Sequence, residues 1–219
     1  MRRRFDAVLF DLDGTLADSA PDLAGAANEQ RVAHGLPALP LEALRPHVGS
    51  GARGMLAAAF DLRPGQPAFE PMKQDFLRRY EARMLAESVL FEDVRALIDA
   101  LTSAGTPWGV VTNKSHRLAS VLMAGLGLQP VRDALVGGDS TPFTKPHPEP
   151  LFEATRRLQV DPARCVFVGD DVRDITAGRA AGMATVVAAW GYLGVGEPAE
   201  RWGADAIMAT PADLSNWLA

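Results

Sequence analysis

Two carboxylates follow the first apolar run of the chain at a spacing that suggests a metal site. Asp11 and Asp13 belong to Asp11-Leu12-Asp13-Gly14-Thr15, directly after the run Ala7–Phe10. If that run is a strand of an open parallel sheet, both acids lie at its carboxyl end, where such sheets bind ligands. Neighbouring carboxylates repel each other unless a cation lies between them, and Mg²⁺ takes oxygen ligands. Considered alone, the stretch is also typical of a simple turn.

A second acidic cluster follows another short apolar run. Gly169-Asp170-Asp171-Val172-Arg173-Asp174 comes directly after Cys165–Val168. Asp170 or Asp171 could cap a following helix, but one cap needs one acid and does not account for three. If the two apolar runs are neighbouring strands, we expect the two clusters to place four carboxylates around one ion.

Two further polar positions could bind an anion. Thr112-Asn113 ends the apolar run Trp108–Val111, and a hydroxyl with the N–H groups of a following turn can bind phosphate oxygens. Lys145 lies in Thr144-Lys145-Pro146-His147-Pro148-Glu149-Pro150, where the prolines stiffen the loop and could hold the ammonium beside the carboxylates. Taken singly, a helix cap and an exposed surface lysine are the simpler interpretations.

Short apolar runs and helical stripes alternate through the second half of the chain. This alternation predicts an α/β fold, a doubly wound parallel sheet with helices on both faces. The predicted strands are 7–10, 108–111, 165–168 and 184–189, with 134–136 as a weaker candidate. Apolar stripes between them predict helices within 94–101, 118–126 and 151–158.

The segment 16–87 interrupts this alternation and contains no convincing strand. Ser19-Ala20-Pro21-Asp22 resembles a capping box that opens a helix ending near His34-Gly35. A second helical stripe comprises Phe69, Met72, Phe76, Tyr80 and Met84. We therefore expect two domains: an α/β core of residues 1–15 plus 88–219, and a helical domain of residues 16–87 inserted after the first strand.

The four pieces, in this order, resemble the motifs of the haloacid dehalogenase superfamily of hydrolases. The motifs are Asp11–Thr15, Thr112, Lys145 and Gly169–Asp174, and the resemblance covers essentially the whole chain. Within the superfamily, the chain looks most like the phosphoglycolate-phosphatase group. The stretches 108–114 and 50–53 also resemble bacterial N-acetylmuramic acid 6-phosphate phosphatases. By this resemblance, the segment 16–87 is an α-helical cap.

The resemblance implies a Mg²⁺-dependent phosphatase with defined residue roles. Asp11 would be the nucleophile that forms an aspartyl-phosphate, and Asp13 would be the general acid and then the base. Mg²⁺ would be held by Asp11, Asp170 and the backbone carbonyl of Asp13, with Asp171 or Asp174 behind them.

The same resemblance assigns the groups that bind the substrate. Thr112, the backbone of Asn113 and Lys145 would stabilise charge on the transferring oxygens. Arg53 lies in a glycine-rich turn of the cap and could grip a substrate carboxylate, which both candidate substrates carry. A solvated helix residue is an equally good interpretation of Arg53.

Other functions compete with a phosphatase. A dehalogenase would not need Asp13, because halide leaves without a proton. A phosphonatase needs a Schiff-base lysine in the cap, where Lys73 is the only lysine and belongs to the striped helix. A phospho-signalling receiver domain has its phosphorylated acid on the third strand and no insertion after the first. A phosphomutase stays open, as does the choice between 2-phosphoglycolate, N-acetylmuramic acid 6-phosphate and another sugar phosphate.

The composition limits the partners and the compartment. The chain has 219 residues, a formal net charge of −5 and one cysteine, Cys165. A mildly acidic chain is a poor general nucleic-acid binder, and a lone cysteine is typical of a reducing cytosol. No apolar run is long enough for a signal peptide or a spanning helix. We expect a cytoplasmic monomer or homodimer that acts on a small phosphorylated metabolite, with no nucleic-acid or membrane partner.

Overall fold

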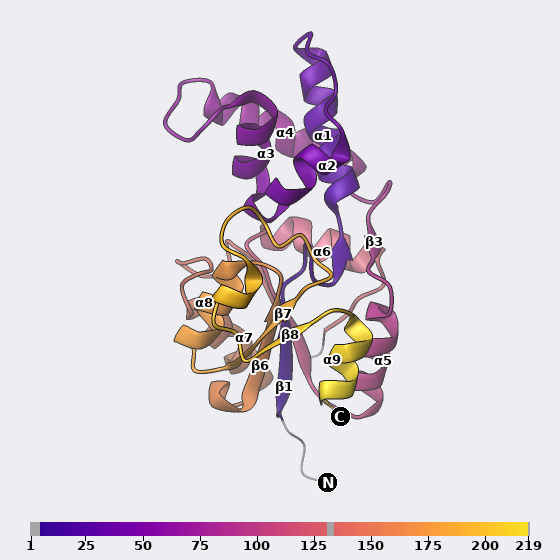
Figure 1. Ribbon diagram of the computed structural model, residues 1–219, viewed down its shortest axis with the longest axis vertical. Coiled ribbons are helices and arrows are strands. Elements are labelled where there is room, and N and C mark those ends of the chain that lie inside the picture. The colour runs from indigo at the N-terminus through magenta and orange to yellow at the C-terminus, as the bar shows by residue number, and fades with distance from the viewer. Residues whose placement is uncertain (1–4, 131–133, 219) are drawn as a thin grey trace.

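A parallel sheet flanked by helices forms the lower part of the molecule in the view of Figure 1. The structure, a computed structural model, describes residues 5–130 and 134–218. The strands of this sheet are β1 Ala7–Phe10, β4 Trp108–Val111, β5 Leu135–Val136, β6 Cys165–Gly169, β7 Ala184–Ala188 and β8 Ala206–Met208. They pair in the order β5-β4-β1-β6-β7-β8, and every pairing is parallel. The predicted α/β class with a doubly wound sheet is confirmed.

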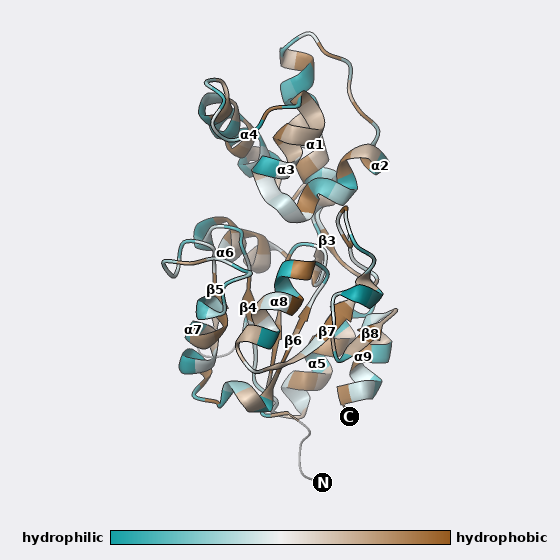
Figure 2. Cartoon of the chain, turned by 60° about the vertical axis from the view of Figure 1, so that its left-hand side comes forward, coloured by the Kyte–Doolittle hydropathy of each residue, from teal (hydrophilic) through white to brown (hydrophobic). Residues whose placement is uncertain are grey.

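Helices cover both faces of this sheet, because successive residues of a strand point to opposite sides. The helices are α5 Val94–Ser103, α6 His116–Gly125, α7 Glu149–Leu158, α8 Val172–Ala180 and α9 Pro211–Leu218. Along β1, Ala7 and Leu9 pack with α7 and α8, whereas Val8 and Phe10 pack with α5, α6 and α9. The central strands are coloured as hydrophobic in Figure 2, and they form the core together with the helices on both faces of the sheet.

The segment after β1 forms a separate group of helices at one end of the molecule (Figure 1). It contains α1 Ala20–Ala33, α2 Leu41–Leu44, α3 Gly51–Phe60 and α4 Phe69–Arg83, with a 3-10 turn at Arg45–Ser50. The predicted stripe on α4 is buried at Phe69, Phe76, Tyr80 and Met84, and Met72 is partly buried. None of the helices in the described ranges is long and apolar enough to cross a membrane.

Two short strands, which the sequence analysis did not predict, connect the helical segment to the sheet. β2 Ala17–Asp18 and β3 Val89–Leu90 pair antiparallel. Next to them, the buried Asp22 Oδ2 accepts hydrogen bonds from Ser88 N and Ser88 Oγ, both at 2.8 Å. These bonds fix the outgoing and returning chain side by side. The division into 1–15 plus 88–219 and 16–87 stays a prediction, and the two strands flank its boundaries.

The capping box predicted at residues 19–22 is wrong. Ser19 precedes α1, but its side chain makes no capping hydrogen bond with that helix. Its hydroxyl donates instead to Asp13 Oδ1, and its backbone N–H donates to the Tyr192 hydroxyl at 2.9 Å. A serine that precedes a helix is therefore used here to hold an acid of the first motif.

Candidate active site

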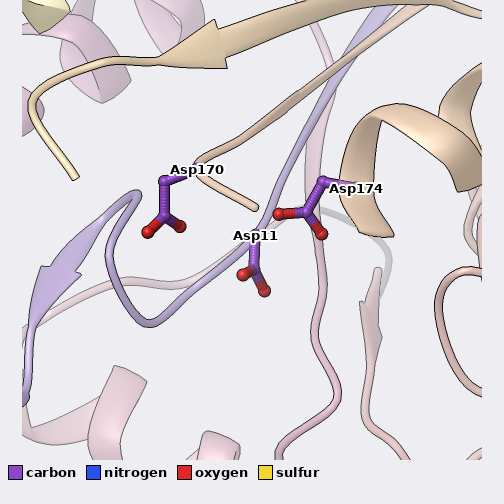
Figure 3. A group of neighbouring side chains, drawn as sticks. All are labelled: Asp11, Asp170 and Asp174. Carbon is purple, nitrogen blue, oxygen red and sulfur yellow. The ribbon is translucent and has the colours of Figure 1, made fainter. Parts of the chain in front are cut away.

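Three carboxylates meet at the carboxyl end of the sheet (Figure 3). Asp11 directly follows β1, and Asp170 and Asp174 follow the neighbouring strand β6. One carboxylate oxygen of each acid lies within 4.8 Å of those of the other two. Because parallel neighbours end at the same edge, the pairing of β1 with β6 brings Asp11 together with Asp170 and Asp174. Three carboxylates meet here and not the four expected, because the side chains of Asp13 and Asp171 take other partners.

Asp170 is a buried carboxylate that has no cationic partner among the described residues. Its Oδ1 accepts a hydrogen bond from Thr15 Oγ1 at 3.0 Å, and its Oδ2 accepts one from Tyr192 N at 2.9 Å. Burial raises the pKa of Asp170, and the negative charges of Asp11 and Asp174 raise it further. A divalent cation would relieve this repulsion, and carboxylate oxygens are the donors that Mg²⁺ prefers. The three acids therefore fit a magnesium site.

Gly14 allows the loop after β1 to pass close to Asp170. Its φ is +92°, which disfavours residues with a side chain, and an added Cβ would lie 2.1 Å from Asp170 Oδ2. The glycine of the first motif is thus required by the close approach of Asp170, an acid of the last motif.

Lys145 supplies the positive charge of the cluster. Its Nζ lies 2.8 Å from Asp11 Oδ1 and 2.7 Å from Asp174 Oδ1, and it donates to the carbonyl of Val111 at 2.8 Å. Burial opposes the charged form, but the two carboxylates raise the pKa of Lys145 above its usual value. The ammonium therefore stays charged beside the proposed nucleophile.

Thr112 and Asn113 follow β4, and Asn113 fixes the loop that carries Lys145. Thr112 N donates to Val136 O at 2.9 Å, which continues the pairing of β4 with β5. The Asn113 side chain accepts from Lys145 N and donates to Lys145 O, both at 2.9 Å. The direct phosphate contacts of Thr112 and Asn113 stay a prediction, but both residues line the cavity described below.

Asp13 is held by Lys114, to which the sequence analysis gave no role. Lys114 Nζ donates to both carboxylate oxygens of Asp13 at 2.8 Å, and Ser19 Oγ donates to Oδ1. Asp13 therefore faces a cation of its own and is not in the three-acid cluster. The available signal was that Lys114 lies in the same loop as Thr112, at the end of a predicted strand.

Asp171 caps α8 and joins the sheet to the helical segment through Arg173. Its side chain accepts from Arg173 N at 2.9 Å, and Asp174 Oδ2 accepts from Asp171 N at 3.1 Å, which completes a capping box. Burial would raise the pKa of Asp171, but hydrogen bonds from Arg173 hold it below its usual value. Arg173 also donates to Gly49 O at 2.5 Å, across the boundary between the two layers.

A cavity of about 610 Å³ opens over the acids, between the sheet and the helical segment. Its floor contains Asp11, Lys145 and Asp170, and its other walls include apolar side chains such as Val48 and Phe76. Arg53 of α3 lines the same cavity, is exposed, and makes no hydrogen bond or ion pair with another described residue. The predicted substrate contact of Arg53 is therefore sterically available and stays a prediction.

Comparison with known proteins agrees with this arrangement. A family model described as "haloacid dehalogenase-like hydrolase" matches residues 5–182. The chain is 43% identical over 217 residues to an N-acetylmuramic acid 6-phosphate phosphatase of Pseudomonas aeruginosa, covering 99% of this chain and 96% of that protein. It is 46% identical over 209 residues to a phosphoglycolate phosphatase of Xanthomonas campestris, covering 95% of this chain and 94% of that protein.

Solved structures are similar over the full length. The crystal structure of a predicted phosphoglycolate phosphatase from Haemophilus somnus superposes with a TM-score of 0.86 at 28% identity, covering 100% of both chains. CbbY from Rhodobacter sphaeroides, in complex with phosphate, gives a TM-score of 0.75 at 27% identity, covering 96% of each chain. This chain therefore belongs to the haloacid dehalogenase-like hydrolases and is a phosphoric monoester hydrolase.

Proposed function

We propose that the protein is a Mg²⁺-dependent phosphatase that acts through an aspartyl-phosphate on a small phosphate monoester carrying a carboxylate, such as 2-phosphoglycolate. The main support is the charge pattern at the end of the sheet. Lys145 forms ion pairs with Asp11 and Asp174, whereas Asp170 is buried without a cation among the described residues. The uncompensated charge of Asp170 supports a divalent cation at this place, and the cavity over Asp11 supports a phosphoryl group beside it.

The residues of the chain divide the reaction between them. A carboxylate oxygen of Asp11 attacks phosphorus, so a bond from Asp11 to phosphorus forms as the bond to the leaving oxygen breaks. Asp13 gives a proton to that oxygen, and it later takes one from the water that cleaves the aspartyl-phosphate. Lys145 and Thr112 stabilise charge on the transferring oxygens. Positioned proton transfer of this kind contributes about 10²–10⁴-fold.

Asp11, Asp170 and the backbone carbonyl of Asp13 would hold Mg²⁺, with Asp174 close behind. When bound, the ion offsets the repulsion between the Asp11 carboxylate and the phosphate dianion. Because Asp171 is occupied by the helix cap and by Arg173, Asp174 is the better candidate for the supporting position.

The cavity supports a second substrate candidate. About 610 Å³ exceeds the needs of a two-carbon acid phosphate, and apolar walls could pack against the acetyl group of N-acetylmuramic acid 6-phosphate. The similar protein from Pseudomonas aeruginosa is named an N-acetylmuramic acid 6-phosphate phosphatase. Both substrates carry a carboxylate that Arg53 could bind.

Phosphate release tests the proposed function. The purified chain is assayed with and without Mg²⁺ on 2-phosphoglycolate, N-acetylmuramate 6-phosphate and neutral sugar phosphates. We expect Mg²⁺-dependent release, fastest on a carboxylate-bearing ester. Asp11→Asn should abolish turnover with the fold intact, because an amide is a far weaker nucleophile and lacks the charge that Lys145 binds.

The matched control is Asp99→Asn, an exposed acid of α5. It should behave as the wild type. Phosphate release by Asp11→Asn at the wild-type rate would refute the nucleophile assignment. Transfer of the phosphoryl group to a second sugar hydroxyl, without net release to water, would favour the phosphomutase alternative.

A further inference from the structure

Lys114 carries a buried ammonium group that lies where the helical segment meets the sheet. Its side chain is 8% exposed and lies in the loop between β4 and α6, where its N–H donates to Thr112 Oγ1 at 3.2 Å. Its Nζ lies 2.8 Å from both oxygens of Asp13. Burial opposes the charged form, but Asp13 raises the pKa of Lys114. The pair is thus a charged contact made inside the cavity.

Simple stabilisation is a poor explanation for this pair. Removing two charges from water costs about as much as their attraction returns, so a buried ion pair adds little net stability. Both oxygens of Asp13 are engaged, and Ser19 donates a third hydrogen bond to one of them. Three hydrogen bonds from two donor groups restrict the rotation of this carboxylate.

The other contact of Lys114 comes from the helical segment. The ring of Tyr80, on α4, lies with its centroid 4.7 Å from Lys114 Nζ, which is within the range of a cation–π contact. Tyr80 is 1% exposed. Tyr80 lines the same cavity, and its hydroxyl is buried. Lys114 thus lies between the Tyr80 ring of the helical segment and Asp13 in the loop after β1.

We propose that Lys114 is a positioning residue that orients Asp13 for proton transfer, and that Tyr80 makes this orientation depend on the helical segment lying over the sheet. The proposal rests on the proposed function, in which Asp13 takes a proton from the attacking water. In that step the water O–H bond breaks, an O–H bond forms on Asp13, and the phosphorus–Asp11 bond breaks as the water oxygen binds phosphorus. Lys114 keeps its protons throughout.

An aryl phosphate isolates this step. p-Nitrophenolate leaves without a proton, so formation of the aspartyl-phosphate does not use Asp13, whereas its hydrolysis does. Rapid mixing of Lys114→Met with Mg²⁺ and p-nitrophenyl phosphate should give a burst of about one p-nitrophenolate per chain. The slow phase that follows should be at least about tenfold slower than wild-type turnover. The burst itself reports a folded chain with a working nucleophile.

Companion variants make the result decisive. Lys114→Arg keeps a charged donor and should recover part of the slow-phase rate. Tyr80→Leu, which removes the ring, should slow the second phase more than Tyr80→Phe, which keeps it. A steady rate without a burst in Lys114→Met, or loss of both phases in Lys114→Met and Lys114→Arg alike, overturns the proposal.

Asp13→Ala separates this proposal from the one on which it rests. If Asp13→Ala gives a burst and a slow phase but Lys114→Met does not, the positioning role is wrong and the proposed function stands. If Asp13→Ala turns over at the wild-type rate, the proton-transfer role of Asp13 is wrong, and the role of Lys114 falls with it.

Discussion

Of the three clustered acids, Asp11 and Asp174 form ion pairs with Lys145, and Asp170 does not. Lys145 pairs with Asp11 and Asp174, whereas Asp170 receives only the neutral donors of Thr15 and Tyr192. A buried carboxylate is costly unless a cation compensates it. Under the proposed function, Asp170 is therefore the acid whose charge a bound metal ion would compensate most.

Replacement of Asp170 should weaken metal binding more than replacement of its neighbour. Asp170→Asn removes one carboxylate of three and should raise the Mg²⁺ concentration for half-maximal activity by about tenfold or more. Asp171→Asn is the matched control, because Asn keeps a helix cap and Asp171 lies outside the cluster. Titration of activity with Mg²⁺ measures both. Equal shifts in the two variants would argue against the metal set.

The chemistry of single side chains was predictable where each residue follows its own strand. Asp11, Thr112 and Asp170 each come directly after an apolar run, so their types and positions indicated one edge of a sheet. Lys114 was missed because its partner Asp13 lies 101 positions away in the chain. Ser19 was misassigned because local sequence favours a cap, whereas a tertiary contact takes its hydroxyl.

Neighbouring strands and the loops after them position these groups. β1 lies between β4 and β6, so three consecutive strands of the sheet end around one cavity. Asn113, after β4, fixes the backbone of Lys145 in the loop before α7. The strands and most core helices were predictable from apolar runs and stripes. β2, β3 and β8 were not, because two- and three-residue strands carry too few side chains to show a period, and the equally short β5 was expected only as a weaker candidate.

Cys165, the first residue of β6, should lower the stability of the folded protein at alkaline pH. Burial raises the pKa of the Cys165 thiol to about 12, from a usual value of 9.0. Between these values the unfolded chain loses the thiol proton and the folded chain keeps it, so the free energy of unfolding falls as pH rises. Denaturant unfolding above and below pH 9.0 should show this fall, and Cys165→Ala should show a smaller one.

Alkylation gives an independent measure of the same thiol. Iodoacetamide reacts with the thiolate, so it should label Cys165 slowly in the folded protein and rapidly in denaturant. Equally fast labelling of the folded protein at neutral pH would contradict the buried, protonated state of this cysteine.

The cavity lies between the sheet and the helical segment, and several ion pairs and hydrogen bonds join these two parts of the molecule. Arg173 reaches Gly49 on one side, and Arg117 of α6 pairs with Glu81 of α4 on another. At β2, Arg45 Nη2 lies 3.0 Å from Asp18 Oδ2. The inserted helices were predictable from the missing strands in 16–87. The walls that they give the cavity were not, because these walls depend on how α3 and α4 pack over the sheet.

The cavity wall provided by α3 should set the preference for carboxylate-bearing substrates. Arg53→Ala should raise KM by about tenfold for esters with a carboxylate and much less for neutral sugar phosphates, because a charged hydrogen bond is lost only with the former. Arg63→Ala, an exposed arginine outside the cavity, is the control. Steady-state kinetics on matched ester pairs measures the difference. The same rise in KM for both substrate types would rule out the carboxylate contact.

Chemical trapping of the covalent intermediate tests the central claim most directly. The enzyme is acid-quenched during turnover with Mg²⁺ and substrate, and borohydride then reduces any aspartyl-phosphate to homoserine. Peptide mass spectrometry should locate homoserine at position 11 and at no other aspartate, and Asp11→Asn should give none. Homoserine at another position, or phosphate release by the wild-type enzyme with no acyl phosphate trapped either there or in Lys114→Met, would contradict the account.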